Sequence, residues 1–213
     1  SKGLLRQQIE NNKITSCVFY GPPGCGKTAL GRLIQRSTSH NMIFLNAVKT
    51  SVQDIRKISN DVRITNQTII IFLDEIHRFN KAQQDSLLED IETNRIILIG
   101  ATTENPSICL NKALLSRLKI YSFTPLAAEE LEQIVENCFK NKEYGLGRYT
   151  YKFADEGSKS FLFAVSNGDS RVLLNLLEYL AMNREKNEGV INIEKESLKK
   201  IVDRIGYKYD ISG

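Results

Sequence analysis

Residues 21–28 form a glycine-rich segment that reads Gly21-Pro22-Pro23-Gly24-Cys25-Gly26-Lys27-Thr28. An apolar run at 17–20 precedes this segment, and a helical pattern at 28–37 follows it. The spacing G-x-x-x-x-G-K-T between a strand and a helix is typical of a phosphate-binding loop, in which backbone N–H groups and the helix N-terminus face phosphate oxygens. We therefore expect all eight residues to bind ATP, with Lys27 at the β- and γ-phosphates and the Thr28 hydroxyl on Mg²⁺.

Apolar β-rich runs alternate with helical patterns through the first half of the chain. The expected strands are 17–20, 42–45, 68–73, 95–99 and 119–123, and the expected helices are 28–37, 52–64 and 81–91. The strand at 68–73 is apolar on both faces, as a buried parallel strand should be. This alternation predicts an α/β fold, a parallel sheet with helices on both faces.

After Pro125 the pattern becomes helical. Apolar residues recur at helical spacing within 131–139, 173–180 and 198–205, and a further helix is expected at about 154–165. The polar segment 141–151 contains two glycines and is expected to be a loop. We therefore predict a P-loop ATPase domain at residues 1–124, followed by a small all-helical lid domain at residues 125–213.

Composition excludes several classes of protein. The 213 residues are 41% hydrophobic and 25% charged, which is ordinary for a globular protein, and no apolar run approaches the roughly 18 residues that span a bilayer. The four cysteines lack paired spacing, which argues against a disulfide framework and a zinc site and favours the cytoplasm. The net charge of +4 permits contact with nucleic acid without requiring it.

An acid pair, Asp74-Glu75, follows the third expected strand. The carboxyl ends of parallel strands border the crevice where α/β sheets bind ligands, so both carboxylates should face the phosphate loop. We expect Asp74 to hold the hydrated Mg²⁺, and Glu75 to polarise the attacking water as the catalytic base. The alternative is a pair of solvated acids, which the upstream phosphate loop disfavours.

The fourth expected strand leads into a polar segment, Gly100-Ala101-Thr102-Thr103-Glu104-Asn105. This strand should lie beside the acid pair and the phosphate loop. Thr103 could then orient the attacking water or contact the γ-phosphate. Thr103 could instead cap the strand end, and Asn105 is a competitor for the same role.

Several segments together resemble an AAA+ ATPase of the replication-associated recombination protein A family, the bacterial counterpart of the Werner-helicase-interacting protein. The segment at 72–85 reads Phe-Leu-Asp-Glu-Ile-His-Arg-Phe-Asn-Lys-Ala-Gln-Gln-Asp, and that at 99–107 reads Ile-Gly-Ala-Thr-Thr-Glu-Asn-Pro-Ser. Further matches lie at 113–117, 145–147 and 167–171. The resemblance covers nearly the whole chain.

The resemblance implies roles for two arginines. Arg117 corresponds to an arginine finger, which would reach the γ-phosphate bound by a neighbouring subunit and stabilise charge in the transition state. Arg171 corresponds to the sensor-two arginine of the lid, which would contact the same phosphate in cis. Taken alone, each arginine is more simply explained as a surface charge.

The resemblance also implies a function, a DNA-dependent ATPase acting in replication-fork maintenance, recombination and repair. The implied partners are ATP with Mg²⁺, single-stranded or forked DNA, other copies of the chain, and a single-stranded-DNA-binding protein, at the nucleoid. The family's adenine-enclosing segment would precede Lys2, and its C-terminal oligomerisation domain would begin just beyond 204–213, near Tyr209-Asp210. We therefore expect the chain to be the isolated ATPase core.

Three other functions compete with this interpretation. A clamp-loader subunit would usually carry a zinc module or a different sequence after the acid pair. A Holliday-junction branch-migration motor would share Asp-Glu-Ile-His but differ after His77 and carry a winged-helix domain. A regulatory module that binds nucleotide without hydrolysing it would not need Glu75 as a catalytic base. Contacts with DNA stay open, because basic residues such as Lys49, Lys57 and Arg78 could line a channel or simply be solvated.

Overall fold

A computed structural model describes residues 3–183 and 189–205, and in it the chain divides into two compact units. The first unit comprises Ser1–Pro22 and Gly26–Thr124, and the second comprises Pro23–Cys25 and Pro125–Gly213. The junction expected near Tyr209-Asp210 lies outside the described residues. Among the helices of the described ranges, none combines the length and the apolar character needed to cross a bilayer.

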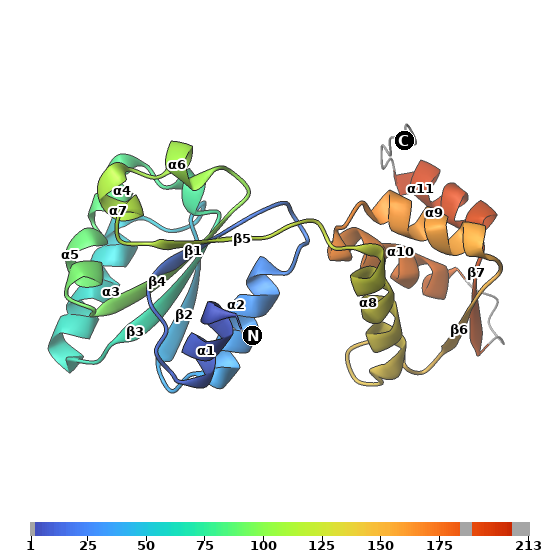
Figure 1. Ribbon diagram of the computed structural model, residues 1–213, viewed down its shortest axis with the longest axis horizontal. Helices are drawn as coiled ribbons and strands as arrows, with labels where there is room; N and C mark the ends of the chain where they lie inside the picture. The colour runs from blue at the N-terminus through green and yellow to red at the C-terminus, as the bar shows by residue number, and fades with distance from the viewer. Residues whose placement is uncertain (1–2, 184–188, 206–213) are drawn as a thin grey trace. The chain divides into compact units, whose positions relative to one another are not determined.

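The first unit is built on a five-stranded parallel sheet with the strand order β2-β3-β4-β1-β5 (Figure 1). Its strands are β1 Cys17–Tyr20, β2 Asn41–Asn46, β3 Ile69–Asp74, β4 Ile96–Thr102 and β5 Lys119–Ser122. All neighbouring pairs are parallel, with Cys17 opposite both Ile99 and Lys119. The predicted α/β class and the five predicted strands are confirmed.

Helices precede and connect these strands. They are α1 Leu4–Glu10, α2 Lys27–Ser37, α3 Val52–Thr65, the 3₁₀ helix η1 Ile76–Arg78, α4 Lys81–Asp85, α5 Leu88–Glu92, α6 Pro106–Cys109 and α7 Lys112–Leu115. The single helix predicted at 81–91 is wrong in detail, because the chain forms α4 and α5 there. The N–H of Leu87 bonds to the carbonyl of Gln84, three residues back, so the apolar spacing persists while the α-helical bonding is interrupted.

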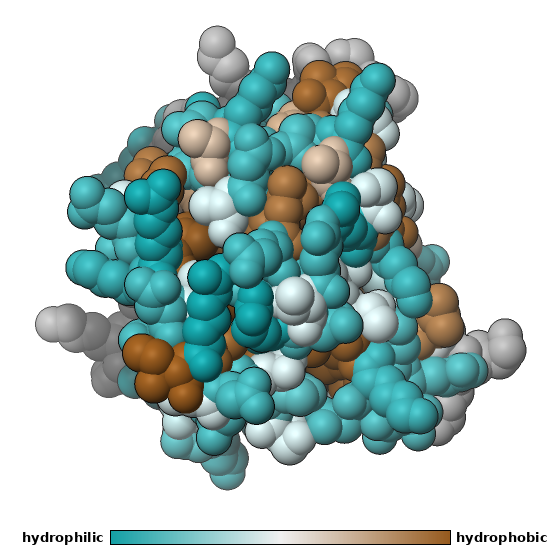
Figure 2. Space-filling view, turned by 90° about the vertical axis from the view of Figure 1, so that its left-hand side faces the viewer, coloured by the Kyte–Doolittle hydropathy of each residue, from teal (hydrophilic) through white to brown (hydrophobic). Residues whose placement is uncertain are grey.

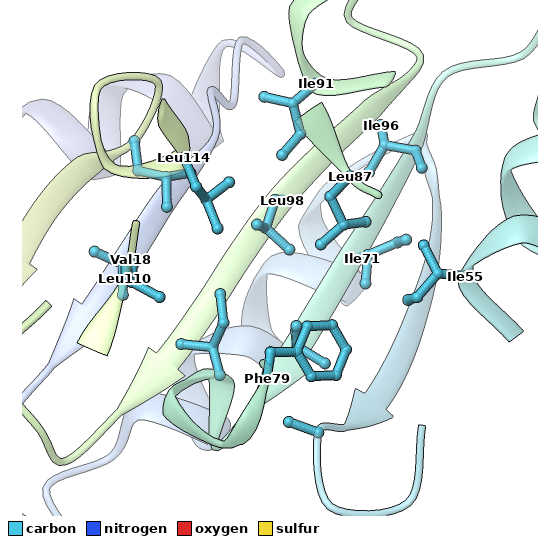
Figure 3. Close-up of a cluster of buried hydrophobic side chains, with 14 of the residues drawn as sticks. Val18, Ile55, Ile71, Phe79, Leu87, Ile91, Ile96, Leu98, Leu110 and Leu114 are labelled. Atoms are coloured by element: carbon cyan, nitrogen blue, oxygen red, sulfur yellow. The ribbon is translucent and has the colours of Figure 1, made fainter. Parts of the chain in front are cut away.

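Two apolar clusters cover the two faces of this sheet. Side chains of β3 alternate between them, with Ile69, Ile71 and Leu73 in one cluster and Ile70 and Phe72 in the other. Figure 3 shows the first cluster, which α3, α5, α6 and α7 complete. The second cluster packs against α1 and α2. Each fully buried Ile or Phe side chain stabilises the fold by about 1.5–3 kcal/mol, so burial on both faces fixes the strand order and register.

The second unit contains α8 Ala128–Lys140, α9 Glu156–Ser166, α10 Ser170–Met182 and α11 Lys195–Ile205 around one apolar core. Its helical character is as expected. It is not all-helical, however, because β6 Thr150–Phe153 and β7 Val190–Ile193 form a two-stranded parallel sheet. Both segments alternate exposed and more buried side chains, the period of a strand, although β6 begins within the segment predicted to be a loop.

Candidate nucleotide-binding site

The candidate site lies at the edge of the sheet in the first unit where the parallel strands end, here called the carboxyl edge. β1 ends at Tyr20, directly before the glycine-rich segment, and β3 ends at Asp74. β4, which lies between these two strands, ends at Thr102. The topology therefore brings the phosphate loop, the acid pair and the end of β4 to the edge at which α/β sheets bind ligands.

Glycine is needed at Gly21 and Gly26 of the loop for two different reasons, close packing and backbone conformation. A Cβ atom on Gly21 would overlap the carbonyl oxygen of Phe123, so no side chain fits there. Gly26 has a φ of 96° and directly precedes α2, which begins at Lys27. This left-handed conformation is disfavoured for residues with a side chain. The loop can therefore turn sharply into the helix and present its N–H groups at the helix N-terminus.

Lys27 is the first residue of α2 and is 8% exposed. Its ammonium donates hydrogen bonds to the carbonyl oxygens of Gly21 and Pro22, each at 2.7 Å. A buried ammonium needs such partners, because desolvation of a charge is costly. The contacts hold the positive charge against the backbone of the loop, where it can attract phosphate.

Thr28 and Asp74 supply oxygen atoms suited to Mg²⁺. The Thr28 hydroxyl lies 3.3 Å from Asp74 Oδ2, and Asp74 Oδ1 accepts a hydrogen bond from the Glu75 N–H at 3.1 Å. Mg²⁺ prefers hard oxygen ligands and usually retains water while binding one or two protein groups and substrate phosphates. Residues 3–183 and 189–205 contain no cluster of three or more His, Cys, Asp or Glu side chains that could hold a metal. The residues present thus fit an ion held jointly by the protein and a nucleotide.

Glu75 has an unusual backbone conformation. Its φ and ψ are 56° and 39°, in the left-handed region, and it caps η1. A non-glycine residue in a sparsely populated conformation costs of order 1–3 kcal/mol, and such strain clusters at functional sites. The carbonyl of Glu75 accepts the N–H of Arg78 at 2.8 Å, which helps hold this turn. The chain therefore reverses sharply after β3 and leaves the Glu75 carboxylate at the carboxyl edge.

The end of β4 contributes Thr102, a residue that the sequence analysis did not single out. Thr102 is 1% exposed, and its hydroxyl lies 3.0 Å from His77 Nδ1. His77 Nδ1 also lies 3.4 Å from Glu75 Oε2. Burial raises the pKa of the nearby Cys109 thiol, and a hydrogen bond with Thr102 partly offsets that rise. Thr103 is exposed, so its predicted contact with the water or phosphate stays a prediction.

Arg117 lies at the opposite edge of the sheet, where the strands begin, here called the amino edge. It follows α7 and stands two residues before Lys119, which pairs with Cys17 at the start of β1. Its guanidinium forms an ion pair with Glu92 and donates a hydrogen bond to Ser116 Oγ at 3.1 Å. A strand of the length of β1, four residues, spans about 13 Å, so the sheet separates Arg117 from the loop of its own chain.

Arg171 belongs to the second unit and lies at the start of α10. It is exposed, and its Nε lies 3.8 Å from Asp169 Oδ1. The same carboxylate oxygen accepts the backbone N–H of Arg171 at 2.8 Å and so caps the helix. The structure thus gives Arg171 a fixed backbone position and an exposed side chain.

The fold and the site define a class, the P-loop nucleotide-binding proteins that carry an acid pair at the end of a neighbouring strand. A more particular assignment follows from comparison with known proteins. Residues 17–126 match the ATPase family associated with various cellular activities (AAA), and residues 148–213 match the AAA C-terminal domain. The chain belongs to the AAA family of ATPases.

Curated relatives share more of the chain. The replication-associated recombination protein A of Haemophilus influenzae is 36% identical over 212 residues, which cover 98% of this chain and 47% of the relative. The protein of the same name from Escherichia coli K12 is 37% identical over 213 residues, with 98% and 47% covered. ATPase WRNIP1 of Dictyostelium discoideum is 39% identical over 188 residues, with 87% and 21% covered. The resemblance to this group is confirmed, and the chain spans about half the length of the bacterial relatives.

Solved structures give the same fold. The RuvB Holliday junction branch migration motor of Thermotoga maritima superposes with a TM-score of 0.70. The match covers 94% of this chain and 65% of that one at 23% sequence identity. At this identity the likeness supports the AAA+ fold of the chain.

Proposed function

We propose that this chain is the ATPase core of a DNA-dependent AAA+ protein that acts in replication-fork maintenance, recombination and repair. One observation carries the proposal. The site residues lie within a chain that is 36–37% identical, over 98% of its length, to proteins named replication-associated recombination protein A. That group name associates the relatives with replication and recombination, and the phosphate loop supplies the means of using ATP.

Within the proposed function, residues 1–124 form the P-loop ATPase domain. Residues 21–28 bind the phosphates, and Thr28 and Asp74 hold Mg²⁺, which neutralises charge on the β- and γ-phosphates. Glu75 polarises the attacking water as a general base, and Thr103 orients that water or contacts the γ-phosphate. The adjacency of the Thr28 hydroxyl and the Asp74 carboxylate, at 3.3 Å, supports the Mg²⁺ assignment.

Arg117 acts in trans in this proposal, as the finger that completes the site of a neighbouring subunit. Its position at the amino edge supports that role, because the loop of its own chain lies at the carboxyl edge. A homo-oligomer is then required for full turnover. Residues 125–213 form the lid, and Arg171 contacts the γ-phosphate from there as sensor two.

DNA, single-stranded or forked, is the proposed macromolecular partner, and a single-stranded-DNA-binding protein at the nucleoid is a further one. Exposed basic residues occur on neighbouring elements near the carboxyl edge, namely Lys49, Arg56, Lys57, Arg78 and Lys81. These elements touch, since Gln83 Nε2 of α4 donates to the carbonyl of Thr50, just before α3, at 2.9 Å. A basic surface of this kind suits the phosphate backbone, which dominates non-specific affinity for DNA.

The alternatives have less support. The likeness to the branch-migration motor is one of fold at 23% identity, and the bacterial relatives described above carry replication-associated names rather than clamp-loader names. Neither alternative explains the 36–37% identity, over 98% of the chain, to proteins named replication-associated recombination protein A.

The test is the rate of ATP hydrolysis by the full-length protein without DNA and with duplex, gapped or forked DNA. We expect hydrolysis to rise severalfold with gapped or forked DNA, and Lys27→Ala to abolish both the basal and the stimulated rates. A rate that ignores every DNA, or that rises only when a sliding clamp is added, would overturn the proposal.

A further inference from the structure

His77 is a buried polar side chain beside the proposed catalytic base. Its ring is 5% exposed, although it follows the acid pair by only two residues. Three oxygen atoms surround it. His77 Nδ1 lies 3.0 Å from Thr102 Oγ1 and 3.4 Å from Glu75 Oε2, and Nε2 lies 3.6 Å from Glu104 Oε1. The ring therefore joins the turn after β3 to the end of β4.

The two ring nitrogens have different surroundings. A proton on Nδ1 points toward both Thr102 and Glu75, whereas a proton on Nε2 alone would leave the Nδ1 lone pair facing the Glu75 carboxylate. The Thr102 hydroxyl is itself held, because it accepts the backbone N–H of Glu104 at 2.9 Å. A ring that carries a proton on Nδ1 thus links Glu75 to a fixed group on β4.

The burial of His77 is not explained by the needs of its acidic neighbours. The side chains of Glu75 and Glu104 are 41% and 56% exposed, so water can solvate both carboxylates without the imidazole. An apolar residue would fill the same space without the cost of desolvating a polar ring. The polar ring therefore adds orientation rather than neutralisation.

We propose that His77 is a positioning residue that fixes the carboxylate of Glu75 through Nδ1, with Thr102 as its support. The inference rests on the proposed function, because it requires Glu75 to be the general base. A base must be held within hydrogen-bonding reach of its water, and a misplacement of about 1 Å can cost about a hundredfold in rate. The side chain of Glu75 is partly exposed and has several rotatable bonds. Its contact with His77 Nδ1 therefore restricts the orientations that the carboxylate can adopt.

Matched substitutions separate the two ring nitrogens. The side-chain amide of His77→Asn places a donor near the Nδ1 position, and that of His77→Gln places one near the Nε2 position. In the full-length protein we expect His77→Ala and His77→Gln to lower kcat by about tenfold to a hundredfold, with KM for ATP within about twofold of wild type. We expect His77→Asn to retain about tenfold more activity than His77→Gln.

A double mutant tests whether His77 acts through Glu75. In a Glu75→Gln background, His77→Ala should lower the residual rate by less than about twofold, because residues that act as a unit are not additive. Thr102→Val keeps the shape of the support and removes its hydroxyl, and it should lower kcat severalfold even if the His77 variants fold poorly. Thermal unfolding and nucleotide binding are measured on every variant.

The outcomes discriminate between the inference and the function on which it rests. Wild-type kcat in His77→Ala, equal activities of the Asn and Gln variants, or full additivity with Glu75→Gln would each overturn the positioning role. A variant with unchanged kcat and either a lower melting temperature or a raised KM would also overturn the positioning role, because such a result indicates a structural role. Full turnover in Glu75→Gln itself would instead refute the assignment of the base.

Discussion

The two edges of the parallel sheet carry charged side chains of opposite character. At the amino edge, Asp90 is fully buried, bonded to the Ser59 hydroxyl and 3.0 Å and 3.5 Å from the Nε atoms of Arg95 and Arg63. At the carboxyl edge, Asp74 is only partly buried, and its contacts are with the Thr28 hydroxyl and a backbone N–H. The first carboxylate is neutralised by arginines, whereas the second is available to a cation and its water.

The difference between these two carboxylates distinguishes a group that stabilises the fold from a group that is suited to binding a cation. A buried carboxylate needs cationic and hydrogen-bonding partners, and once it has them it is a structural group. Arg63, Glu89, Asp90 and Arg95 form a charged cluster at the amino edge. This cluster joins α3 to α5, because Glu89 also pairs with Arg63 and Arg95 at 2.9 Å and 3.0 Å. Seen from the side of α3 and α5, the surface is largely hydrophilic with small hydrophobic spots (Figure 2). Arg117 is the proposed exception, an amino-edge group assigned to catalysis in a neighbour.

The largest expected effect is therefore that of Arg117→Ala. Removing an arginine finger typically costs about 10³–10⁵-fold in kcat, and we expect a loss of that order in the full-length oligomer with near-normal ATP binding. The measurement is steady-state ATP hydrolysis beside nucleotide affinity. An equal loss in a proven monomer would contradict a role in trans.

Mixing two inactive proteins sharpens this test. Lys27→Ala subunits keep the finger and lose the phosphate site, and Arg117→Ala subunits do the reverse. Mixed oligomers should regain part of the turnover, because some interfaces then combine an intact finger with an intact loop. If the mixture stays as inactive as its components, Arg117 serves its own chain or the structure of the interface.

The next effect is that of Glu75→Gln at the carboxyl edge. General base catalysis contributes about 10²–10⁴-fold, so turnover should fall by that amount while ATP stays bound. The melting temperature should hardly change, because Glu75 is partly exposed and its backbone conformation is kept. Single-turnover hydrolysis and trapped nucleotide are measured together, and retention of full turnover would remove Glu75 from the mechanism.

At the amino edge, Asp90→Ala should lower the stability of the fold rather than act on the nucleotide site. Breaking a buried ion pair costs about 3–5 kcal/mol, and we expect about 3 kcal/mol, since Arg63 and Arg95 keep Glu89 as a partner. Nucleotide affinity of the folded protein should not change. Denaturant unfolding gives the loss, and Asp61→Ala, at an exposed position of α3, is the matched control with an effect of about 0.5 kcal/mol or less. Equal losses of stability in Asp90→Ala and Asp61→Ala would contradict the structural role assigned to the buried carboxylate at the amino edge.

Sequence patterns predicted the inner strands β1, β3 and β4 because burial on both faces makes them largely apolar, as 69–73 shows. Three short helices, α1, α6 and α7, were missed because four to seven residues carry too little periodicity. The break between α4 and α5 was missed for a different reason, because its residues stay near helical angles.

The placement of Lys27 and Asp74 at the carboxyl edge was predictable, because a motif or a strand end fixes the position of each along the chain. The contact between His77 and Thr102 beside Glu75 was not predictable, because the two residues are 25 positions apart and meet only once β3 and β4 pair. The buried position of Asp90 was likewise invisible, since a carboxylate in a sequence gives no sign of arginines brought to it by folding.

The smallest expected effect concerns the start of α3, the helix that runs between the two edges. At its start, near the carboxyl edge, Ser51 and Asp54 form an exposed capping box, in which Asp54 accepts the Ser51 hydroxyl at 2.7 Å and its N–H at 2.9 Å. These bonds hold the pKa of Asp54 below its usual value of 3.8, and Lys57 contributes least. The cap therefore stabilises the fold fully above that usual value, and this contribution is lost as pH falls through the lowered pKa. Ser51→Ala should raise the pKa of Asp54, measured by NMR titration, more than Lys57→Met does. A larger rise in Lys57→Met would show that charge, rather than hydrogen bonding, governs this end of the helix.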